Sequence, residues 1–353
     1  MSRRLFSLVA FAAYVCVLAV IAPPASALKY AAVEHHLKVD PSMPSWTPGP
    51  LDIQPEEEMN VVGADVLDEI TLGWIKIFRK AYPHLSVTLE ARSSGGGAQG
   101  LINGTGDLDP VGRELLPAEE KAFEAKFGYK PFFVKIATGS AGSLGKTAAS
   151  IILVDKDNPI AGLSLAQIDA IYSTTRKRGH ADISTWGDLA LTGAWKDRPI
   201  HLYGLKPPNG IEQYIQDRVM EGGAYKTNIE FVKGKGFTHA FTVAAQDMAS
   251  HPGGLTYALL ANVIPNVKVV PLSEKDGGPY YMPTVENVYT HKYPLSRYVY
   301  IFVNRPPGQP LKPKVKEFLK LVLSKQGQEV VASEGVYIPL MPSVVQEELK
   351  KLD

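Results

Sequence analysis

The chain has 353 residues, and its 37 lysines and arginines nearly balance its 36 aspartates and glutamates. A net charge of +1 indicates neither nucleic acid nor an anionic membrane as a partner, because both recruit strongly basic surfaces. The length exceeds that of one small domain and favours two α/β lobes, each with its own core.

The first 27 residues have the form of a secretory signal peptide. Two arginines precede an apolar stretch of about 18 residues from Leu5 to Ala22, and Ala25-Ser26-Ala27 supplies the small residues of a cleavage site. An uncleaved anchor is the alternative, since such a stretch is at the lower limit for a membrane-spanning helix. Cleavage near Ala27 would remove the single cysteine, Cys16, and leave 35 basic against 36 acidic residues, a net charge of −1. We therefore expect a soluble periplasmic or secreted protein without disulfides.

Residues 28–58 follow the signal and contain five prolines and an acidic run. This composition predicts an irregular Pro-rich N-terminal arm outside the core. A short strand is expected at 59–63. Apolar residues at helical spacing then predict a helix over 66–81, which ends at Tyr82-Pro83 because proline disfavours helix in the residue before it.

A glycine-rich segment, Arg92–Leu101, reads R-S-S-G-G-G-A-Q-G-L and follows the alternating strand pattern of residues 85–90. Apolar residues resume at Leu101, so the glycines lie where a strand leads into a helix. Backbone N–H groups at such a junction form a cradle for an anion. A flexible surface turn is the alternative for an isolated glycine run.

Strands and helices alternate along the rest of the chain. Segment 106–113 is expected as a short strand ending in a loop, Pro117 and Gly128 mark the start and the end of a helix, and Ser164 and Gln167 form a capping box. Strands are further expected at 132–137, 151–154, 200–203, 255–258, 267–270 and 298–303, and helices at 165–172, 237–248 and 315–332, the last as one long amphipathic helix. This alternation predicts the α/β class.

Several of these stretches together resemble the phosphate ABC-transporter substrate-binding proteins, a type II periplasmic binding-protein family. They are G-A-D-V-L (63–67), Y-P-H-L-S-V (82–87), S-S-G-G-G (93–97), K-D-N-P-I-A-G-L-S-L-A-Q-I-D-A-I-Y (156–172), T-W-G-D-L (185–189), I-H-L-Y-G (200–204), E-N-V-Y-T-H-K-Y-P-L-S-R-Y-V-Y-I-F-V-N (286–304) and F-L-K-L-V-L-S-K-Q-G-Q-E-V-V (318–331). The similarity extends from about Asn60 to Leu340. Their order and spacing are specific, although no single stretch would be.

The resemblance implies two lobes, each a mixed sheet flanked by helices, joined by two crossing strands that act as a hinge. Residues 59–153 plus 298–353 would form lobe I and residues 154–297 lobe II, with the ligand held in the cleft between them. The family binds its oxyanion with hydroxyls, an arginine and backbone N–H groups at helix starts. The matching positions here are Asp65, Ser93, Ser94, Gly95, Arg113, Lys206, Asn209 and Gly210.

The sequence departs from the family pattern at several of these points. G-S-D-T becomes G-A-D-V at 63–66, P-M-S-R becomes P-V-G-R at 110–113, and G-R-x-x-S-G-T becomes G-L-K-P-P-N-G-I at 204–211. An arginine and several hydroxyls are thereby lost, each a bond of roughly 1–3 kcal/mol, and about 1.4 kcal/mol is a factor of ten in affinity. Lys206 would supply a point charge but not a planar fork. For Arg113 the alternative role is an ion pair at a strand end.

Other chemistry finds little support in the sequence. Ser93 and Ser94 lie in no G-x-S-x-G elbow, and no H-E-x-x-H pair occurs. Gly145-Lys146-Thr147 has the final letters of a P-loop, but Gly139 lies six rather than five positions before Gly145. We therefore expect a protein without catalysis, metal or cofactor.

The leading hypothesis is a monomeric solute-binding protein that holds phosphate, another oxyanion or another small solute, with an ABC-transporter permease as its partner. The alternative is a degenerate family member that acts as an interaction scaffold, with the arm at 41–55 and the basic loop at 173–179 as docking surfaces. A cleft closed by Val66, Leu205 and Ile211 would favour the scaffold. Five or more hydrogen-bond donors converging in the cleft would favour phosphate.

Overall fold

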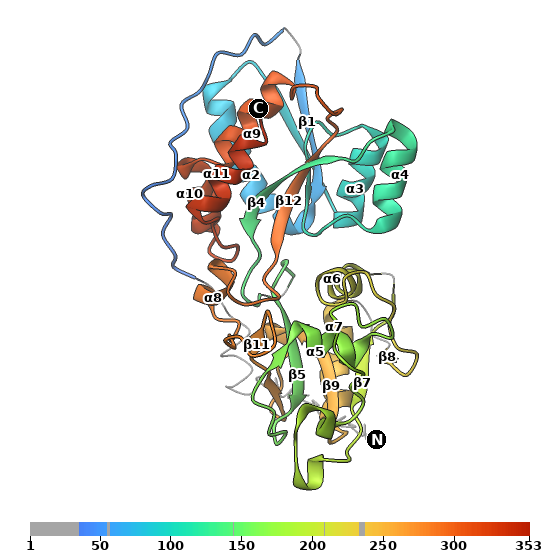
Figure 1. Ribbon diagram of the computed structural model, residues 1–353. Coiled ribbons are helices and arrows are strands. Elements are labelled where there is room, and N and C mark those ends of the chain that lie inside the picture. Colours follow the sequence, from blue (N-terminus) through green and yellow to red (C-terminus); the bar gives the residue numbers. More distant parts are fainter. Residues whose placement is uncertain (1–34, 55–56, 144, 208, 233–236) are drawn as a thin grey trace, which may run out of the picture.

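The computed structural model describes residues 35–54, 57–143, 145–207, 209–232 and 237–353. Within them the chain forms two α/β lobes, one above the other in Figure 1, and this confirms the predicted fold class. The expected signal peptide, residues 1–27, lies outside the described residues. No helix in the described ranges is long and apolar enough to cross a membrane.

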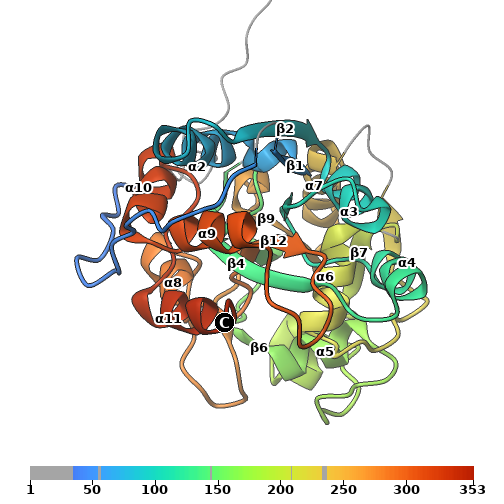
Figure 2. The same cartoon turned by 90° about the horizontal axis from the view of Figure 1, so that it is seen from above.

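The first lobe contains two small sheets, with β1 parallel to β2 and β12 antiparallel to both of its neighbours, β3 and β4. Its strands are β1 (Glu58–Ala64), β2 (Ser86–Arg92), β3 (Asp109–Val111), β4 (Phe132–Thr138) and β12 (Tyr298–Val303). Its helices are α2 (Asp68–Ala81), α3 (Ser94–Asn103), α4 (Pro117–Phe127), α9 (Pro313–Val322), α10 (Lys325–Glu334) and α11 (Pro342–Lys350), with the 3₁₀ turn η1 (Asp65–Leu67). Viewed from above in Figure 2, α2, α9, α10 and α11 lie on one side of β4 and β12, and α3 and α4 on the other.

Local signals in the sequence set several helix boundaries. Pro117 occupies the first position of α4, and Gly128 ends that helix in the left-handed conformation at φ 82°. The prediction of one helix over 315–332 is wrong, because α9 ends at Val322 and α10 begins at Lys325. Ser324 is extended between them, and its hydroxyl accepts a hydrogen bond from Gly327 N at 3.2 Å. A serine that caps the next helix competes with a continuous helix, while the apolar spacing passes through the break unchanged.

The second lobe is built on a mixed five-stranded sheet in the order β10-β5-β9-β7-β8, with a two-stranded sheet of β11 and β6 beside it. Its strands are β5 (Ser150–Asp155), β6 (Leu163–Ser164), β7 (His201–Leu205), β8 (Glu230–Val232), β9 (Gly254–Leu259), β10 (Val267–Val269) and β11 (Leu272–Ser273). Its helices are α5 (Leu165–Tyr172), α6 (Gly210–Arg218), α7 (Phe237–Ala249) and α8 (Val285–Tyr289), with the 3₁₀ turns η2 (Trp186–Leu189), η3 (Gly193–Trp195) and η4 (Leu260–Asn262). The predicted capping box of α5 is present, with reciprocal bonds between Ser164 and Gln167.

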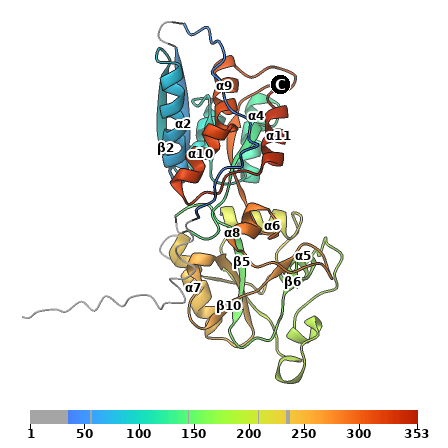
Figure 3. The same ribbon diagram turned by 90° about the vertical axis from the view of Figure 1, so that its left-hand side faces the viewer.

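The lobes meet through two crossing segments, the first described at 139–143 and 145–149 and the second at 290–297. These run side by side, since Gly139 N donates to Arg297 O at 2.8 Å and Ser150 N donates to Leu295 O at 3.2 Å. Beyond the first crossing, β5 pairs along its length with β9, and its apolar side chains belong to the second core. Residues 150–153 therefore lie in the second lobe, and the sequence-based boundary at 153/154 falls too late. Figure 3 shows α6 and α8 on the face of the second lobe nearest the first.

The N-terminal arm is not outside the core where it is described. Residues 35–54 follow the side of the first lobe, drawn in blue in Figure 1, and Met43 is buried in the first core. Trp46 Nε1 donates to Glu317 Oε1 at 2.9 Å, and Tyr82 OH donates to Gly49 O at 2.7 Å. The predicted irregular structure of the arm is confirmed for residues 35–54, but its predicted position outside the core is wrong, because the prolines leave these side chains free to pack.

Candidate functional site

A cavity of about 480 Å³ lies between the lobes. It is lined by Asp65, Val66, Ser93, Ser94, Gly95, Gly112, Arg113, Gly145, Lys146, Thr147, Ala148, Gly210, Ile211, Leu259 and Arg297. These residues come from the turn after β1, the starts of α3 and α6, the loop after β3, the first crossing, the end of β9 and the residue before β12. Six of the eight predicted site residues therefore line one cavity. Lys206 and Asn209 do not.

The start of α3 supplies backbone donors to this cavity. Ser93 caps the helix, because its Oγ accepts a hydrogen bond from Gly96 N at 3.2 Å. The N–H groups of Ser94 and Gly95 have no acceptor among the described residues, as expected for the first turn of a helix. The glycine run is thus the first helical turn itself. A Cβ at Gly97 would lie 3.0 Å from Pro110 O, so glycine lets α3 approach β3 closely.

The start of α6 faces the same cavity from the second lobe. Asn209 caps α6, with its Oδ1 accepting from Ile211 N at 3.0 Å and from Glu212 N at 3.2 Å. Gly210 N has no acceptor in the described chain. A Cβ on Gly210 would be 2.7 Å from Arg113 Cδ, so the two lobes touch at this glycine. The positive ends of two helix dipoles, one from each lobe, therefore reach one cavity.

Asp65 and Ser94 add side-chain oxygens. Asp65 is exposed, and its Oδ1 accepts from Val66 N at 2.9 Å. Ser94 Oγ makes no hydrogen bond within the described residues. A Cβ on Gly112 would lie 3.3 Å from Ser94 Oγ and 2.9 Å from Val66 Cγ2, so these two side chains border the same point. An ionised carboxylate only accepts hydrogen bonds, whereas the serine hydroxyl donates and accepts.

Arg113 is engaged within its own lobe. Its Nη1 and Nη2 donate to the two carboxylate oxygens of Glu119 at 2.7 and 2.8 Å, and Nη1 also donates to Glu114 O at 2.9 Å. This bidentate pair is among the stronger protein ion pairs, and with the bond to Glu114 O it uses three of the five N–H donors of the guanidinium. The structure thus contains the ion pair that the sequence left open as the alternative role of Arg113.

Arg297 lines the cavity, although the sequence did not predict it as a site residue. Its side chain is 4% exposed, its Nη2 donates to Glu114 Oε2 at 2.8 Å, and its guanidinium lies 4.3 Å from the centre of the Tyr214 ring. Its Nε has no partner among the described residues. Burial alone would lower the pKa of Arg297, but the Glu114 carboxylate outweighs that effect and raises it. Only the stretch 286–304, part of the family resemblance, contained any signal for this residue.

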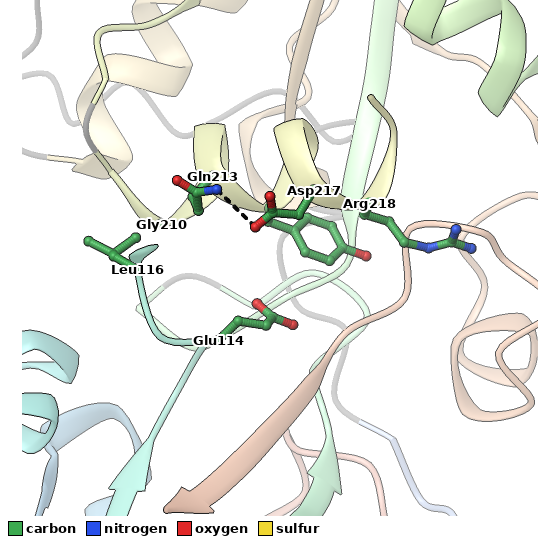
Figure 4. Close-up of a pocket in the computed structure, with 7 residues that line it drawn as sticks. Glu114, Leu116, Gly210, Gln213, Asp217 and Arg218 are labelled. Atoms are coloured by element: carbon green, nitrogen blue, oxygen red, sulfur yellow. Dashed lines mark hydrogen bonds between the residues drawn. The ribbon is translucent and has the colours of Figure 1, made fainter. Parts of the chain in front are cut away.

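Glu114 couples Arg297 to a neighbouring cavity. Desolvation would raise the pKa of Glu114, but Arg297 and a hydrogen bond from Tyr300 OH at 2.9 Å lower it below its usual range. The neighbouring cavity measures about 260 Å³ and is lined by Glu114, Leu116, Gly210, Gln213, Tyr214, Asp217 and Arg218. In Figure 4, Glu114 faces α6 across this space, and a hydrogen bond joins Gln213 to Asp217.

Lys146 and Thr147, discounted above as part of a P-loop, also line the main cavity. Lys146 Nζ pairs with Glu69 and Glu334, each at 3.0 Å, and Thr147 Oγ1 donates to Gly112 O. The three lining cations, Arg113, Lys146 and Arg297, are thus each paired with a carboxylate. No cation pairs with Asp65 in the part of the chain that the structure describes. The attraction for an anion therefore comes from the N-terminal ends of α3 and α6 and from cations that are already paired, rather than from free cations.

The strand-to-helix junction at 204–211, whose residues differ from the family pattern, does not close the cavity. Leu205 is 5% exposed within β7 and belongs to the second core, and Lys206 is exposed to solvent. Val66 and Ile211 line the cavity but leave its volume open. Within the described ranges no group of three or more His, Cys, Asp or Glu side chains could hold a metal ion.

Comparisons with known proteins agree with this architecture. The profile of the PBP superfamily domain matches residues 52–326. The phosphate-binding protein PstS of Pseudomonas aeruginosa is 34% identical over 315 residues, which cover 89% of this chain and 92% of that protein. PstS of Staphylococcus aureus strain MRSA252 is 26% identical over 293 residues, covering 82% of this chain and 79% of that protein.

Solved structures show the same fold at lower identity. An ABC-type phosphate transport receptor from Vibrio cholerae has a TM-score of 0.50 at 17% identity, covering 80% of this chain and 99% of that one. PstS from Borrelia burgdorferi has a TM-score of 0.50 at 16% identity, covering 81% of this chain and 100% of that one. At these identities the likeness concerns the fold.

Proposed function

Since the chain belongs to the PBP superfamily and, within it, to the family of the phosphate-binding protein PstS, we propose that it binds phosphate or a close phosphorus oxyanion between its lobes. It would act without catalysis, as a binding component that presents the ligand to an ABC-transporter permease. The observation that carries the proposal is the meeting of two helix N-termini from opposite lobes at one cavity that Arg113 and Arg297 also line.

The donors around the cavity are sufficient for an oxyanion. The donor groups of lining residues that have no acceptor within the described chain include Ser94 N, Ser94 Oγ, Gly95 N, Gly210 N and Arg113 Nε. Hydrogen bonds to a charged group contribute about 1.5–3 kcal/mol each. The backbone donors of the family pattern are thus retained, and Arg297, which the sequence comparison did not include, adds a second lining arginine.

Asp65 favours phosphate over sulfate. A phosphate near neutral pH keeps a P–OH group that donates a hydrogen bond, whereas sulfate has none. The free oxygen of the Asp65 carboxylate accepts a hydrogen bond from the P–OH group of phosphate and repels sulfate. Since no described cation neutralises Asp65, this repulsion is not compensated within the site.

The scaffold alternative gains no support from the structure. The cavity is not closed by Val66, Leu205 or Ile211. In the basic loop, Arg176 pairs with Asp182 at 3.1 Å, and Arg178 Nε donates to Val219 O at 2.6 Å. Contacts within the molecule thus hold two of the side chains that a docking surface would need.

The proposal includes export and a monomeric state, both of which rest on the sequence. Mass spectrometry of the exported protein should give a mature N-terminus at residue 28. Light scattering should give the mass of one chain, with and without ligand. A retained N-terminus or a stable dimer would contradict these parts of the proposal.

Isothermal titration calorimetry of the chain from residue 28 tests the binding site. We expect one site for phosphate or methylphosphonate and at least tenfold weaker binding of sulfate. Ser94→Ala should weaken binding roughly tenfold, because it removes one hydrogen bond to a charged ligand. Ser333→Ala, which removes an exposed hydroxyl bonded to Glu329 O on α10, is the matched control. Absence of binding by any phosphorus oxyanion at millimolar concentration would refute the proposal.

Asp65→Asn provides an independent test of the same site. The amide removes the negative charge and adds a donor, so the preference for phosphate over sulfate should fall to a few-fold. Asp52→Asn, on the described part of the arm, is the control and should change neither affinity. An unchanged preference in Asp65→Asn would remove Asp65 from the site.

A further inference from the structure

The cavity carries apolar side chains from both lobes beside its donors. Val66 contributes from the first lobe, and Ile211 on α6 and Leu259 at the end of β9 contribute from the second. Val66 is half-buried, whereas Ile211 and Leu259 are 4% and 5% exposed and present only an edge. The ligand therefore meets hydrocarbon as well as hydrogen-bond donors.

The hydrocarbon lies close to the oxyanion end of the cavity. Thr147 Oγ1, Val66 Cγ2 and Ser94 Oγ border the same point above Gly112, at 2.7, 2.9 and 3.3 Å from the position of a Cβ there, and the Thr147 hydroxyl already donates to Gly112 O. An oxyanion that accepts from Ser94 Oγ and the first N–H groups of α3 therefore has Val66 methyl groups beside it. An oxygen turned toward these methyls finds no donor and loses a hydrogen bond that water would have supplied.

The start of α6, on the other side of the cavity, also places an apolar side chain beside a hydrogen-bond donor. Ile211 N is already taken by Asn209 Oδ1 at 3.0 Å, so α6 offers the N–H of Gly210 and the side chain of Ile211. In a free phosphate, Asp65 accepts from the P–OH group, and the starts of α3 and α6 each donate to one further oxygen. The fourth oxygen then faces the apolar side chains, a position that an apolar substituent fills better.

The size of the cavity is also consistent with a ligand that carries an organic substituent. A volume of about 480 Å³ falls within the range of roughly 300–1,000 Å³ that is typical of sites for organic ligands. Arg297 lines one side of this cavity with a side chain that is 4% exposed, so a ligand contacts only its edge.

We propose that the preferred ligand is a phosphorus oxyanion with a short apolar substituent, either an alkylphosphonate or a short alkyl phosphate ester. Its PO₃ group lies at the N-termini of α3 and α6, and its substituent lies against Val66, Ile211 and Leu259. This inference rests on the proposed function and narrows the ligand class of the same site.

The expected affinities follow from the lining groups. Each buried methylene strengthens binding by about fourfold, so the Kd should fall from methyl- to ethyl- to propylphosphonate. Orthophosphate places a fourth oxygen against hydrocarbon and should bind about tenfold more weakly than ethylphosphonate. Ethyl phosphate distinguishes phosphate esters from alkylphosphonates as the ligand class. The bridging oxygen of an ester needs a hydrogen-bond donor that the apolar side chains do not provide.

Calorimetric titration of the chain from residue 28 tests the inference with orthophosphate, the three alkylphosphonates, ethyl phosphate and butyrate. We expect propylphosphonate to bind most tightly and butyrate to bind most weakly. Orthophosphate binding as tightly as every alkylphosphonate would overturn the inference and leave the proposed function intact. Tighter binding of butyrate would overturn the choice of a phosphorus head group, and failure of all phosphorus ligands would overturn the proposed function itself.

Val66→Thr isolates the apolar contact. Threonine keeps the shape of valine and adds a donor, so the preference for ethylphosphonate over orthophosphate should fall about tenfold or invert. Val330→Thr is the matched control, because Val330 is also a half-buried valine packed against the first core but lies on α10 outside the cavity. Equal preferences in the two variants would contradict the role of Val66.

Discussion

Replacing Glu114 by glutamine should destabilise the protein and strengthen its binding of an anion. Glu114 is the counter-charge of Arg297, whose side chain is 4% exposed, and Glu114→Gln leaves that guanidinium with a neutral neighbour. Breaking a fully buried pair costs about 3–5 kcal/mol. The Glu114 side chain is 40% exposed and glutamine still accepts one hydrogen bond, so we expect a loss of about 2 kcal/mol in the free energy of unfolding.

The bound anion then takes over the role of the lost carboxylate. The charge of Arg297, no longer neutralised, should raise the affinity for a phosphorus oxyanion about tenfold, or roughly 1.4 kcal/mol. Two assays check this: urea denaturation without ligand, and calorimetric titration with phosphate or ethylphosphonate. The affinity of the variant should also fall more steeply with added salt.

Glu274→Gln is the control, because it also breaks an Arg–Glu pair, with Arg218, but on the surface. The two side chains of that pair are 34% and 49% exposed, so its loss should cost less than about 1 kcal/mol and leave ligand affinity unchanged. An unchanged or lower affinity in Glu114→Gln, together with reduced stability, would refute the assignment of Arg297 to the ligand site.

Two further predictions concern stability. Burial raises the pKa of Glu212 to about 7 from 4.5, so this group makes stability fall as pH rises from about 4.5 to 7. Burial lowers the pKa of His291 to about 4 from 6.5, so this group makes stability rise over about pH 4 to 6.5. The effects oppose each other, and Glu212→Gln removes the falling contribution, so the melting temperature of the variant should rise more, or fall less, from about pH 4.5 to 6.5 than that of the parent protein; parallel profiles would contradict this. Asn209→Ala removes the cap of α6 and should cost about 1 kcal/mol by urea denaturation, whereas Asn266→Ala, in a loop, should cost little; equal effects would argue against the cap.

The sequence determined those features that depend on neighbouring residues. The capping box of Ser164 and Gln167 and the start and end of α4 at Pro117 and Gly128 are local, and the structure reproduces them. The strand-to-helix junction at the glycine-rich segment was also predicted correctly, but the helix begins at Ser94, so the glycines belong to the helix rather than to a turn before it. Family motifs extended this local information to the two-lobed fold.

Tertiary structure alone decided which charges meet at the cavity. Arg297 lies 183 residues from Glu114, and the sequence gives no measure of that separation in space. The same holds for Lys146, which finds partners on α2 and α10. Apolar spacing likewise could not show the break between α9 and α10, since the periodicity continues across Ser324.

The glycine-rich start of α3 shows how the two sources of information combine. Its backbone donors follow from the chain itself, because any helix leaves its first N–H groups without acceptors. What they face was decided by folding: the start of α6 across the cavity, the Val66 methyl groups and the buried Arg297. Hydrogen bonds at a helix end are fixed by local geometry, whereas the charge and apolar surface around a ligand depend on side chains that only packing brings together.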